Sequence, residues 1–157
     1  MHKDDPQYLS PEKYKELEAE LLELKSVKRK EIAEALEFAK SLGDLSENAE
    51  YQEARENQAA IEDRISKLEN IMKHAVMIAG DHHGGIVELG SHISVRKNGE
   101  KEIMKFAIVG SEEANVTQGK ISNDSPLGKA LIGKKKGDDV TVATPKGKLV
   151  YTVVGIE

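Results

Sequence analysis

The stretch Gly43-Asp44-Leu45-Ser46-Glu47-Asn48-Ala49-Glu50-Tyr51 lies between two long, charged segments of the 157-residue chain. Gly43 can take the positive φ that ends a helix, and Asp44, Ser46 or Asn48 can cap the helix that follows. Both flanking segments have helical spacing. The stretch therefore predicts the tip of a helical hairpin, and this turn decides the fold of the N-terminal half.

The segment before the tip begins with a helix-start signal, Ser10 as N-cap and Pro11 at the first helical position. Apolar residues then follow in steps of three and four, which predicts one apolar seam. They are Tyr14, Leu17, Leu21 and Leu24. The seam loosens from Val27 to Ile32, around Lys28-Arg29-Lys30, and resumes up to Leu42. The basic triplet could contact RNA or a partner, although a solvated helix face is the simpler interpretation.

The segment after the tip has a more regular pattern. Its seam positions alternate steps of three and four without a break, at Tyr51, Ala54, Gln58, Ile61, Ile65, Leu68 and Met72. Two such seams joined by a short turn predict an antiparallel coiled-coil hairpin over residues 1–79. An intermolecular coiled coil and a helical bundle are the alternatives, and the tight turn favours the intramolecular hairpin.

The remaining residues, 80–157, predict a small α+β domain after a glycine-rich linker at Gly80–Gly85. His82 and His83 in this linker do not suffice for a zinc site, which needs three or four convergent ligands. Strands are expected at Ala75–Ile78, His92–Arg96, Ile103–Val109, Val140–Ala143 and Leu149–Val154, with a short helix from Ser125 to Gly133. A hairpin turn is expected at Asn98-Gly99, and residues 1–9 are expected to be a frayed lead-in.

Composition and charge exclude several classes of protein. The chain has no cysteine, so disulfides and thiolate metal sites are excluded, and neither a signal peptide nor a membrane-length apolar run is present. A cytoplasmic location is therefore expected. Residues 1–79 carry a net charge of −6 and residues 80–157 a net charge of +1. An acidic arm does not favour direct binding to duplex nucleic acid, which depends on phosphate neutralisation.

The acids of the tip allow two interpretations. Asp44, Glu47, Glu50 and Glu53 lie near the start of the second helix, where the helix dipole favours acids, and Asp44-x-x-Glu47 has the form of a capping box. Alternatively, Asp44 and Glu47 form half of a magnesium site. Mg²⁺ is commonly held by one or two carboxylates together with substrate phosphates, so a free tip should bind it weakly.

Two motifs resemble one protein family. GDLSENAEY resembles the tip motif of the bacterial Gre transcript-cleavage factors at all nine positions, and Ser125–Gly133 is similar to the family's C-terminal signature. The resemblance covers nearly the whole chain, and the acidic arm is most like that of the less basic family members. It implies a C-terminal domain similar to the FK506-binding isomerase fold. Isomerase activity does not follow, since Phe106 and Tyr151 are the only aromatic rings of residues 80–157.

The resemblance also implies a function. The arm would enter the secondary channel of RNA polymerase, and Asp44 and Glu47 would secure Mg²⁺ for cleavage of backtracked nascent RNA. The protein would not be an enzyme by itself. Lys40 and Arg55 match positions that meet the 3′ end of the RNA, although Lys40 stands where arginine is often found. A monomer is expected.

In the C-terminal domain, Asp124, Ser125 and Pro126 fall where the family binds the rim of the polymerase channel. Their alternative role is structural, since Ser125 can cap a helix that Pro126 starts. Three rival functions stay open at this point. They are a Gre-like inhibitor that occupies the channel without promoting cleavage, a coiled-coil scaffold whose acidic tip is only capped, and a prolyl isomerase.

Overall fold

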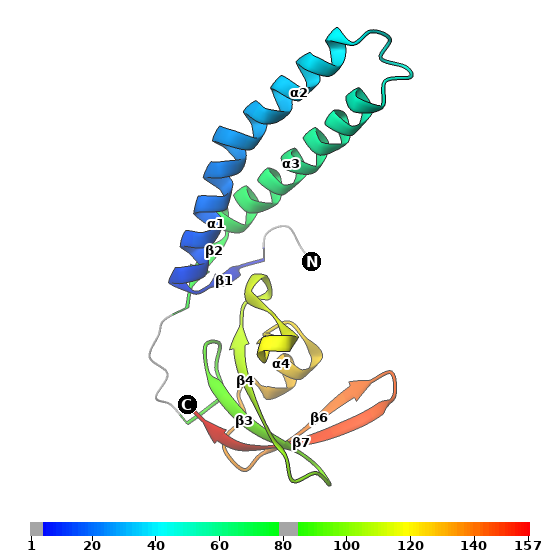
Figure 1. Ribbon diagram of the computed structural model, residues 1–157. Helices are drawn as coiled ribbons and strands as arrows, with labels where there is room; N and C mark the ends of the chain where they lie inside the picture. The colour runs from blue at the N-terminus through cyan, green and yellow to red at the C-terminus, as the bar shows by residue number, and fades with distance from the viewer. Residues whose placement is uncertain (1–4, 79–84) are drawn as a thin grey trace. The chain divides into compact units, whose positions relative to one another are not determined.

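The computed structural model describes residues 5–78 and 85–157 (Figure 1). These residues form two compact units, one containing Glu12–Ala75 and the other Pro6–Pro11 together with Val76–Glu157. The predicted fold class, an α-helical hairpin followed by a small α+β domain, is confirmed. The predicted boundary at residue 79 and the histidines of the linker, His82 and His83, lie outside the described residues.

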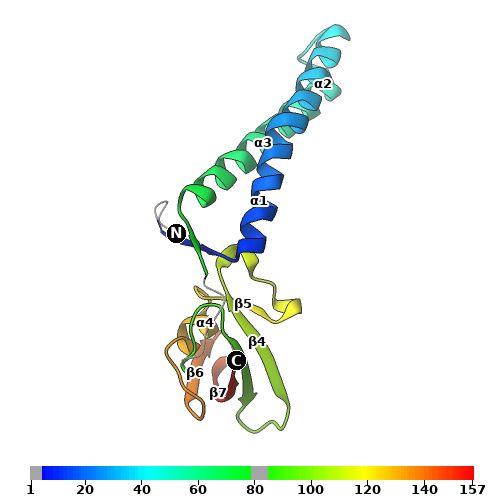
Figure 2. The ribbon, with the colours of Figure 1, turned by 90° about the vertical axis from the view of Figure 1, so that its left-hand side faces the viewer.

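The first unit is the helical hairpin. Its elements are α1 (Pro11–Glu23), the π-helix η1 (Leu24–Lys28), α2 (Arg29–Ser41) and α3 (Ala49–Lys73). Figures 1 and 2 both show α3 returning alongside α2 from the tip. No helix of the described residues is long and apolar enough to cross a membrane.

The predicted seams supply the buried residues of the hairpin except Ile71, which is 7% exposed and stands one residue before the predicted seam position Met72. Leu17 and Ala39 are 1% exposed, and Ala54, Ile65 and Leu68 of α3 are at most 5% exposed. Gln58 is exposed although it occupies a seam position, so the seam is interrupted in the tip half of α3. Small or polar seam residues bury little area, and the large buried side chains Leu17, Ile65 and Leu68 lie in the half of the hairpin farther from the tip.

The π-helix explains why the first seam loosens. Leu24, the first residue of η1, and Ile32, the partly buried apolar residue that follows η1, are eight residues apart, whereas two steps of a regular seam cover seven. A π-turn accommodates one extra residue, because its hydrogen bonds run from i to i+5. Both residues stay partly buried while Val27, between them, is 45% exposed.

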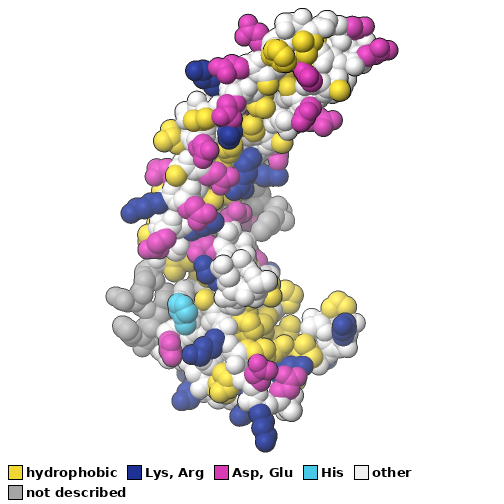
Figure 3. Space-filling view, in the orientation of Figure 1, with side chains coloured by type: hydrophobic (Ala, Val, Ile, Leu, Met, Phe, Trp, Pro, Cys, Tyr) yellow, Lys and Arg dark blue, Asp and Glu magenta, His cyan; other side chains and the backbone are white. Residues whose placement is uncertain are grey.

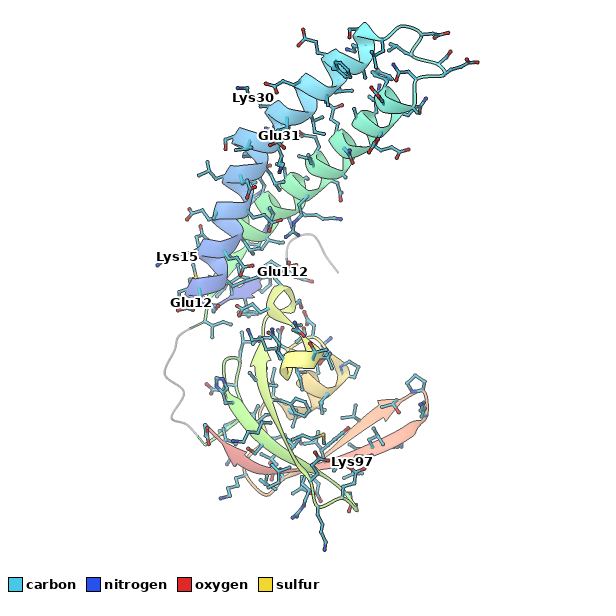
Figure 4. All side chains as sticks on the ribbon, in the orientation of Figure 1. Glu12, Lys15, Lys30, Glu31, Lys97 and Glu112 are labelled. Carbon is cyan, nitrogen blue, oxygen red and sulfur yellow. The ribbon has the colours of Figure 1, made fainter. Side chains whose placement is uncertain are left out.

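Ion pairs across the hairpin lie around this π-turn. Arg64 and Glu20 pair at 2.6 and 2.8 Å, and Arg29 donates to Glu62 through Nε and Nη2, each at 2.7 Å. Lys25 pairs with Glu69. The basic triplet is thus part of the arm's surface, with Lys30 pointing into solvent (Figure 4). The solvated-face interpretation of Lys28-Arg29-Lys30 agrees with these pairs.

The second unit is built on a five-stranded sheet in the order β5-β4-β3-β7-β6. The strands are β3 (His92–Lys97), β4 (Ile103–Val109), β5 (Lys120–Ser122), β6 (Asp139–Thr144) and β7 (Gly147–Ile156). The pair β4–β5 is parallel and the others are antiparallel. The short helix α4 (Pro126–Leu131) packs on β6, and β1 (Gln7–Leu9) pairs with β2 (Ala75–Met77) in a separate small sheet.

Alternation along the strands places the core on one face of this sheet. Ile93 and Val95 of β3 are at most 2% exposed, and both pack with Val153 of β7, which is fully buried. The register with β7 shifts between Ser94 and Val95, a bulge of the kind that bends a strand. The predicted strands and the helix from Ser125 are confirmed within one or two residues at most ends.

Two strands were missing from the sequence prediction. The expectation of a frayed lead-in over residues 1–9 is wrong for Gln7–Leu9, because these residues form β1 and Leu9 is fully buried. The Ser10 N–H donates to the Glu113 carboxylate at 2.6 Å, which fixes this segment to a distant turn. The other missing strand, β5, is three residues long and pairs in parallel with β4.

We expect Gly128→Ala to destabilise the second unit, because a Cβ on this α4 residue would lie 2.0 Å from the Ser122 carbonyl oxygen. Overpacking of this kind costs about 1–3 kcal/mol of unfolding free energy. The matched control is Gly155→Ala, whose Cβ would meet Ser94 at 3.6 Å, an ordinary contact. Native-state hydrogen exchange of the Val153 amide measures the difference. Equal exchange in both variants would contradict this account of α4 packing.

Candidate functional site at the hairpin tip

Asn48 closes the tip through both ends of its side-chain amide. Its Oδ1 accepts the Tyr51 N–H at 3.0 Å and so caps α3, while its Nδ2 donates to the Ala39 carbonyl of α2 at 2.7 Å. One side chain thus joins the end of α2 to the start of α3. Gly43 makes the turn out of α2 with φ at 121°, in the region that glycine tolerates. Of the three predicted caps, Asn48 is the one used.

Asp44 does not cap a helix. Its Oδ1 accepts the Ser46 N–H at 3.0 Å and the Ser46 hydroxyl at 2.9 Å, which forms an Asx-turn within the loop. The backbone N–H, followed by the hydroxyl, lowers the pKa of Asp44 below its ordinary value. The carboxylate is therefore ionised at neutral pH, with one oxygen oriented by Ser46 and the other outside these bonds.

Glu47 lies in the same loop, exposed to solvent. Within the described residues its carboxylate has no hydrogen-bond or ion-pair partner, so the capping-box interpretation of Asp44 and Glu47 is wrong. Asn48 has taken the cap, and both acids present oxygens to solvent. Carboxylate oxygens are the hard ligands that Mg²⁺ prefers, so the residues present fit this ion. No group of three or more metal-ligating side chains forms anywhere in residues 5–78 and 85–157.

The two predicted RNA-contacting residues lie on different helices of the tip half. Lys40 occupies the last turn of α2 and is exposed. Arg55 lies on α3, where its Nη1 donates to the Tyr51 hydroxyl at 3.3 Å and its guanidinium carbon lies 5.9 Å from the Tyr51 ring centroid. The ring restrains Arg55 by a cation–π contact while leaving other donors of its planar fork accessible.

The residues predicted to bind the channel rim lie together in the second unit. Ser125 caps α4, since its Oγ accepts the Gly128 N–H at 3.0 Å, and Pro126 is the first helical residue. Asp124 is exposed just before the cap. The Ser111 hydroxyl donates to its Oδ2 at 3.2 Å. Ser125 and Pro126 therefore have the structural role of starting α4, and Asp124 lies just outside the helix.

An apolar cavity of about 470 Å³ opens beside this segment. Ser125, Pro126 and Leu127 line one side of it, and the aromatic rings of Phe106 and Tyr151 also belong to its lining. Sequence analysis counted these two rings but did not place them together, because they come from strands that are far apart in the chain.

Two serines at these sites escaped the sequence analysis. Ser46 orients Asp44, and the Asp-x-Ser spacing, which favours an Asx-turn, is a signal that could have identified this role. Ser111 holds Asp124 from thirteen residues away, and a contact between distant turns leaves no local pattern. The orientation of Asp124 therefore depends on the tertiary fold.

The chain matches two family models. One, described as "Transcription elongation factor, N-terminal", covers residues 7–77. The other, described as "Transcription elongation factor, GreA/GreB, C-term", covers residues 82–157. The two models together account for nearly the whole chain, in agreement with the two motifs that carried the resemblance.

Relatives of known identity match over most of their length. The chain is 47% identical over 140 residues to the transcription elongation factor GreA of Bacillus velezensis, which covers 89% of each chain. It is 45% identical over 157 residues to the GreA of Roseiflexus castenholzii, which covers 98% of this chain and 99% of the relative. The crystal structure of the GreA factor homolog 1 (Gfh1) of Thermus thermophilus is 32% identical, covers 98% of this chain and 99% of that chain, and superposes with a TM-score of 0.42.

We expect Asn48→Ala to loosen the tip, since the substitution removes both the cap on α3 and the link to α2. Loss of an N-cap costs about 0.5–2 kcal/mol of helix stability. Asn48→Asp is the matched control, because its carboxylate still accepts the Tyr51 N–H but cannot donate to the Ala39 carbonyl. Hydrogen exchange of the Tyr51 amide should rise strongly in Asn48→Ala and little in Asn48→Asp. Unchanged exchange in Asn48→Ala would show that Asn48 does not close the tip.

Proposed function

The chain belongs to the GreA/GreB family of transcription elongation factors, and we propose that it stimulates Mg²⁺-dependent cleavage of backtracked nascent RNA by RNA polymerase. The arm enters the secondary channel of the polymerase and brings its tip to the active centre. The observation that carries the proposal is the tip itself, where Asp44 and Glu47 keep oxygens that the fold does not use. The protein acts in the cytoplasm and supplies residues to an active site that belongs to the polymerase.

The tip alone is an incomplete metal site, because it offers too few ligands to surround an ion. It is an exposed loop with two carboxylates near one another in sequence, and water competes for the remaining positions around an ion. Phosphates of the RNA and groups of the polymerase active centre would complete the ligand set. Held there by Asp44 and Glu47 together with those groups, Mg²⁺ would supply positive charge for phosphodiester hydrolysis and would lower the pKa of a bound water.

Asp44 and Glu47 then have separate tasks. Asp44 is ionised and held by Ser46 before the polymerase is met, so its second oxygen needs little reorganisation to become a ligand. Glu47 has no partner within the described residues, and it can turn toward either the ion or the attacking water. One fixed and one adjustable carboxylate suit a site that is assembled from two proteins.

Basic residues on the two helices meet the RNA. Arg55 is held against Tyr51 and presents its remaining donors to a phosphate, which a planar guanidinium can bind in bidentate fashion. Lys40 contributes a flexible point charge from the last turn of α2. The phosphates that they contact belong to the 3′ segment of the RNA.

The second unit holds the factor at the channel rim. Asp124 is exposed and oriented by Ser111, while Ser125 and Pro126 line the apolar cavity beside it. A charged group next to an apolar recess is the usual composition of a binding hot spot with a polar edge. Affinity for the polymerase therefore comes mainly from this unit and catalytic stimulation from the tip.

The experiment that tests the proposal uses a stalled, backtracked elongation complex and measures short 3′ RNA fragments. We expect Asp44→Asn to abolish stimulated cleavage while binding to the polymerase is retained, because asparagine keeps the oxygen that accepts from Ser46 and removes the charge. Glu18→Gln, on an exposed acid of α1, is the matched control. No cleavage with the unmodified protein would favour the inhibitor alternative, and parental cleavage by Asp44→Asn would refute the assigned role.

A second variant separates geometry from charge at Glu47. If the tip acts only through its negative field, Glu47→Asp should retain most of the activity. If Glu47 places its oxygens on an ion or a water, shortening the side chain moves them by roughly 1 Å, which can cost on the order of 100-fold in rate. We expect Glu47→Asp to be nearly as inactive as Glu47→Gln. Single-turnover cleavage across Mg²⁺ concentrations measures this. An active Glu47→Asp with an inactive Glu47→Gln would contradict the positioning role and support action through the negative field of the tip alone.

A further inference from the structure

A groove of about 240 Å³ lies between α2 and α3 in the tip half of the arm. Its apolar lining comes from Ile32, Ala35 and Phe38 on α2 and from Ala54 on α3. Phe38 is 61% exposed, an unusual state for a ring of this size on a helix that already has a buried seam. Figure 3 shows hydrophobic side chains reaching the surface at the tip end of the hairpin, with acidic side chains around them.

The groove stays open because the neighbouring positions are small or polar. Ala35 and Ala54 face it with single methyl groups, and Asn57 completes the lining. Gln58, which should have filled the next seam position of α3, is exposed instead. No side chain of the described arm closes the recess, so Phe38 contributes its ring to a surface rather than to the arm's core.

The rim of the groove is acidic. Glu50 and Glu53 both line it, and within the described residues neither has an ion-pair partner. In the other half of the arm, acids on the facing surface are paired across the hairpin, as with Glu20 and Arg64. Residues 37–57 hold six acidic and two basic residues, a net charge of −4. The tip half thus carries uncompensated negative charge around an apolar floor.

We propose that this groove docks an apolar side chain flanked by lysine or arginine on the protein wall that surrounds the arm in the polymerase. The apolar side chain covers Phe38, and the basic flanks pair with Glu50 and Glu53. This inference rests on the proposed function, because it assigns the contact to the polymerase. An RNA strand does not fit the groove, since its phosphates would meet the unpaired acids.

The contact would set how far the arm enters and how it is rotated. Phe38 lies three residues before the end of α2 at Ser41, about 4.5 Å along the axis at the standard helical rise, and Asp44 follows in the loop directly after it. A contact with the polymerase this close to the acids would fix their position more firmly than a contact at the far end of the arm. The groove therefore contributes both affinity and placement of Asp44.

The first test compares two apolar residues of similar exposure, Phe38 at 61% and Leu22 at 67%. Phe38→Ser should raise the factor concentration that gives half-maximal cleavage by about tenfold, the loss expected for one anchoring ring, while Phe38→Leu should recover most of it. The control is Leu22→Ser, because Leu22 is 67% exposed on α1, outside the groove. Equal effects of Phe38→Ser and Leu22→Ser would overturn the proposal.

The second test concerns the rim. Glu53→Lys should weaken binding more than Glu18→Lys, which makes the same charge change on an exposed acid of α1. The difference should shrink at high salt, since screening weakens exposed ion pairs. If both variants lose the same affinity at every salt concentration, the rim acids have no specific partner and the proposal fails.

A photo-crosslinking residue at position 38 identifies the occupant directly. Crosslinks to a polymerase segment with an apolar residue beside lysine or arginine support the proposal, and crosslinks mainly to RNA or to a second copy of this chain overturn it. The proposed function fails separately, when the unmodified factor binds the polymerase but releases no RNA fragments. In that case the crosslink and the Phe38→Ser binding measurement still show whether the groove docks a segment of the polymerase.

Discussion

The two hydrogen bonds of the Asn48 amide are the constraint on which the arm's tip depends. They join the last turn of α2 to the first turn of α3, and they satisfy a helix end that would otherwise need another cap. Because asparagine does this work with a neutral side chain, no acid of the loop is required for capping. Asp44 and Glu47 can therefore present charge outward, and the fold of the tip and its proposed chemistry do not compete for the same atoms.

The rest of the arm is stabilised in a way that suits a long, solvated element. Its buried seam is narrow, and the pairs Arg64–Glu20 and Arg29–Glu62 add bidentate contacts at the surface. Exposed pairs of this kind contribute only about 0–1 kcal/mol each, so they fix helix register more than they stabilise the hairpin. These ion pairs also compensate acidic charge in the half of the arm farther from the tip. The uncompensated charge is consequently concentrated in the half that bears the acids.

Elements with a local signal were predictable from the sequence, and elements held by distant contacts were not. The hairpin, the helix at Ser125 and the long strands follow from seam spacing, caps and alternation. The strands β1 and β5 have three residues each, and their pairing partners, β2 and β4, lie elsewhere in the chain, so neither strand has a local signal. At the candidate site, the motif pointed to Asp44 and Glu47 as the proposed metal ligands, whereas the orientation of Asp124 and the opening beside Phe38 depend on tertiary packing.

An exposed pair of carboxylates is a poor catalyst in water, and the proposed function assigns the arm the task of carrying the pair into an enclosed site. In bulk solvent the field of a carboxylate is strongly screened, while in an enclosed site of lower effective dielectric the same charge interacts several times more strongly. The 25 residues of α3 span about 38 Å at the standard helical rise. Under the proposed function, that length would let the second unit stay at a channel entrance while Asp44 and Glu47 reach an enclosed active centre. Stimulation of cleavage, as proposed, would then depend on where the acids are placed, and the free protein would need no complete metal site of its own.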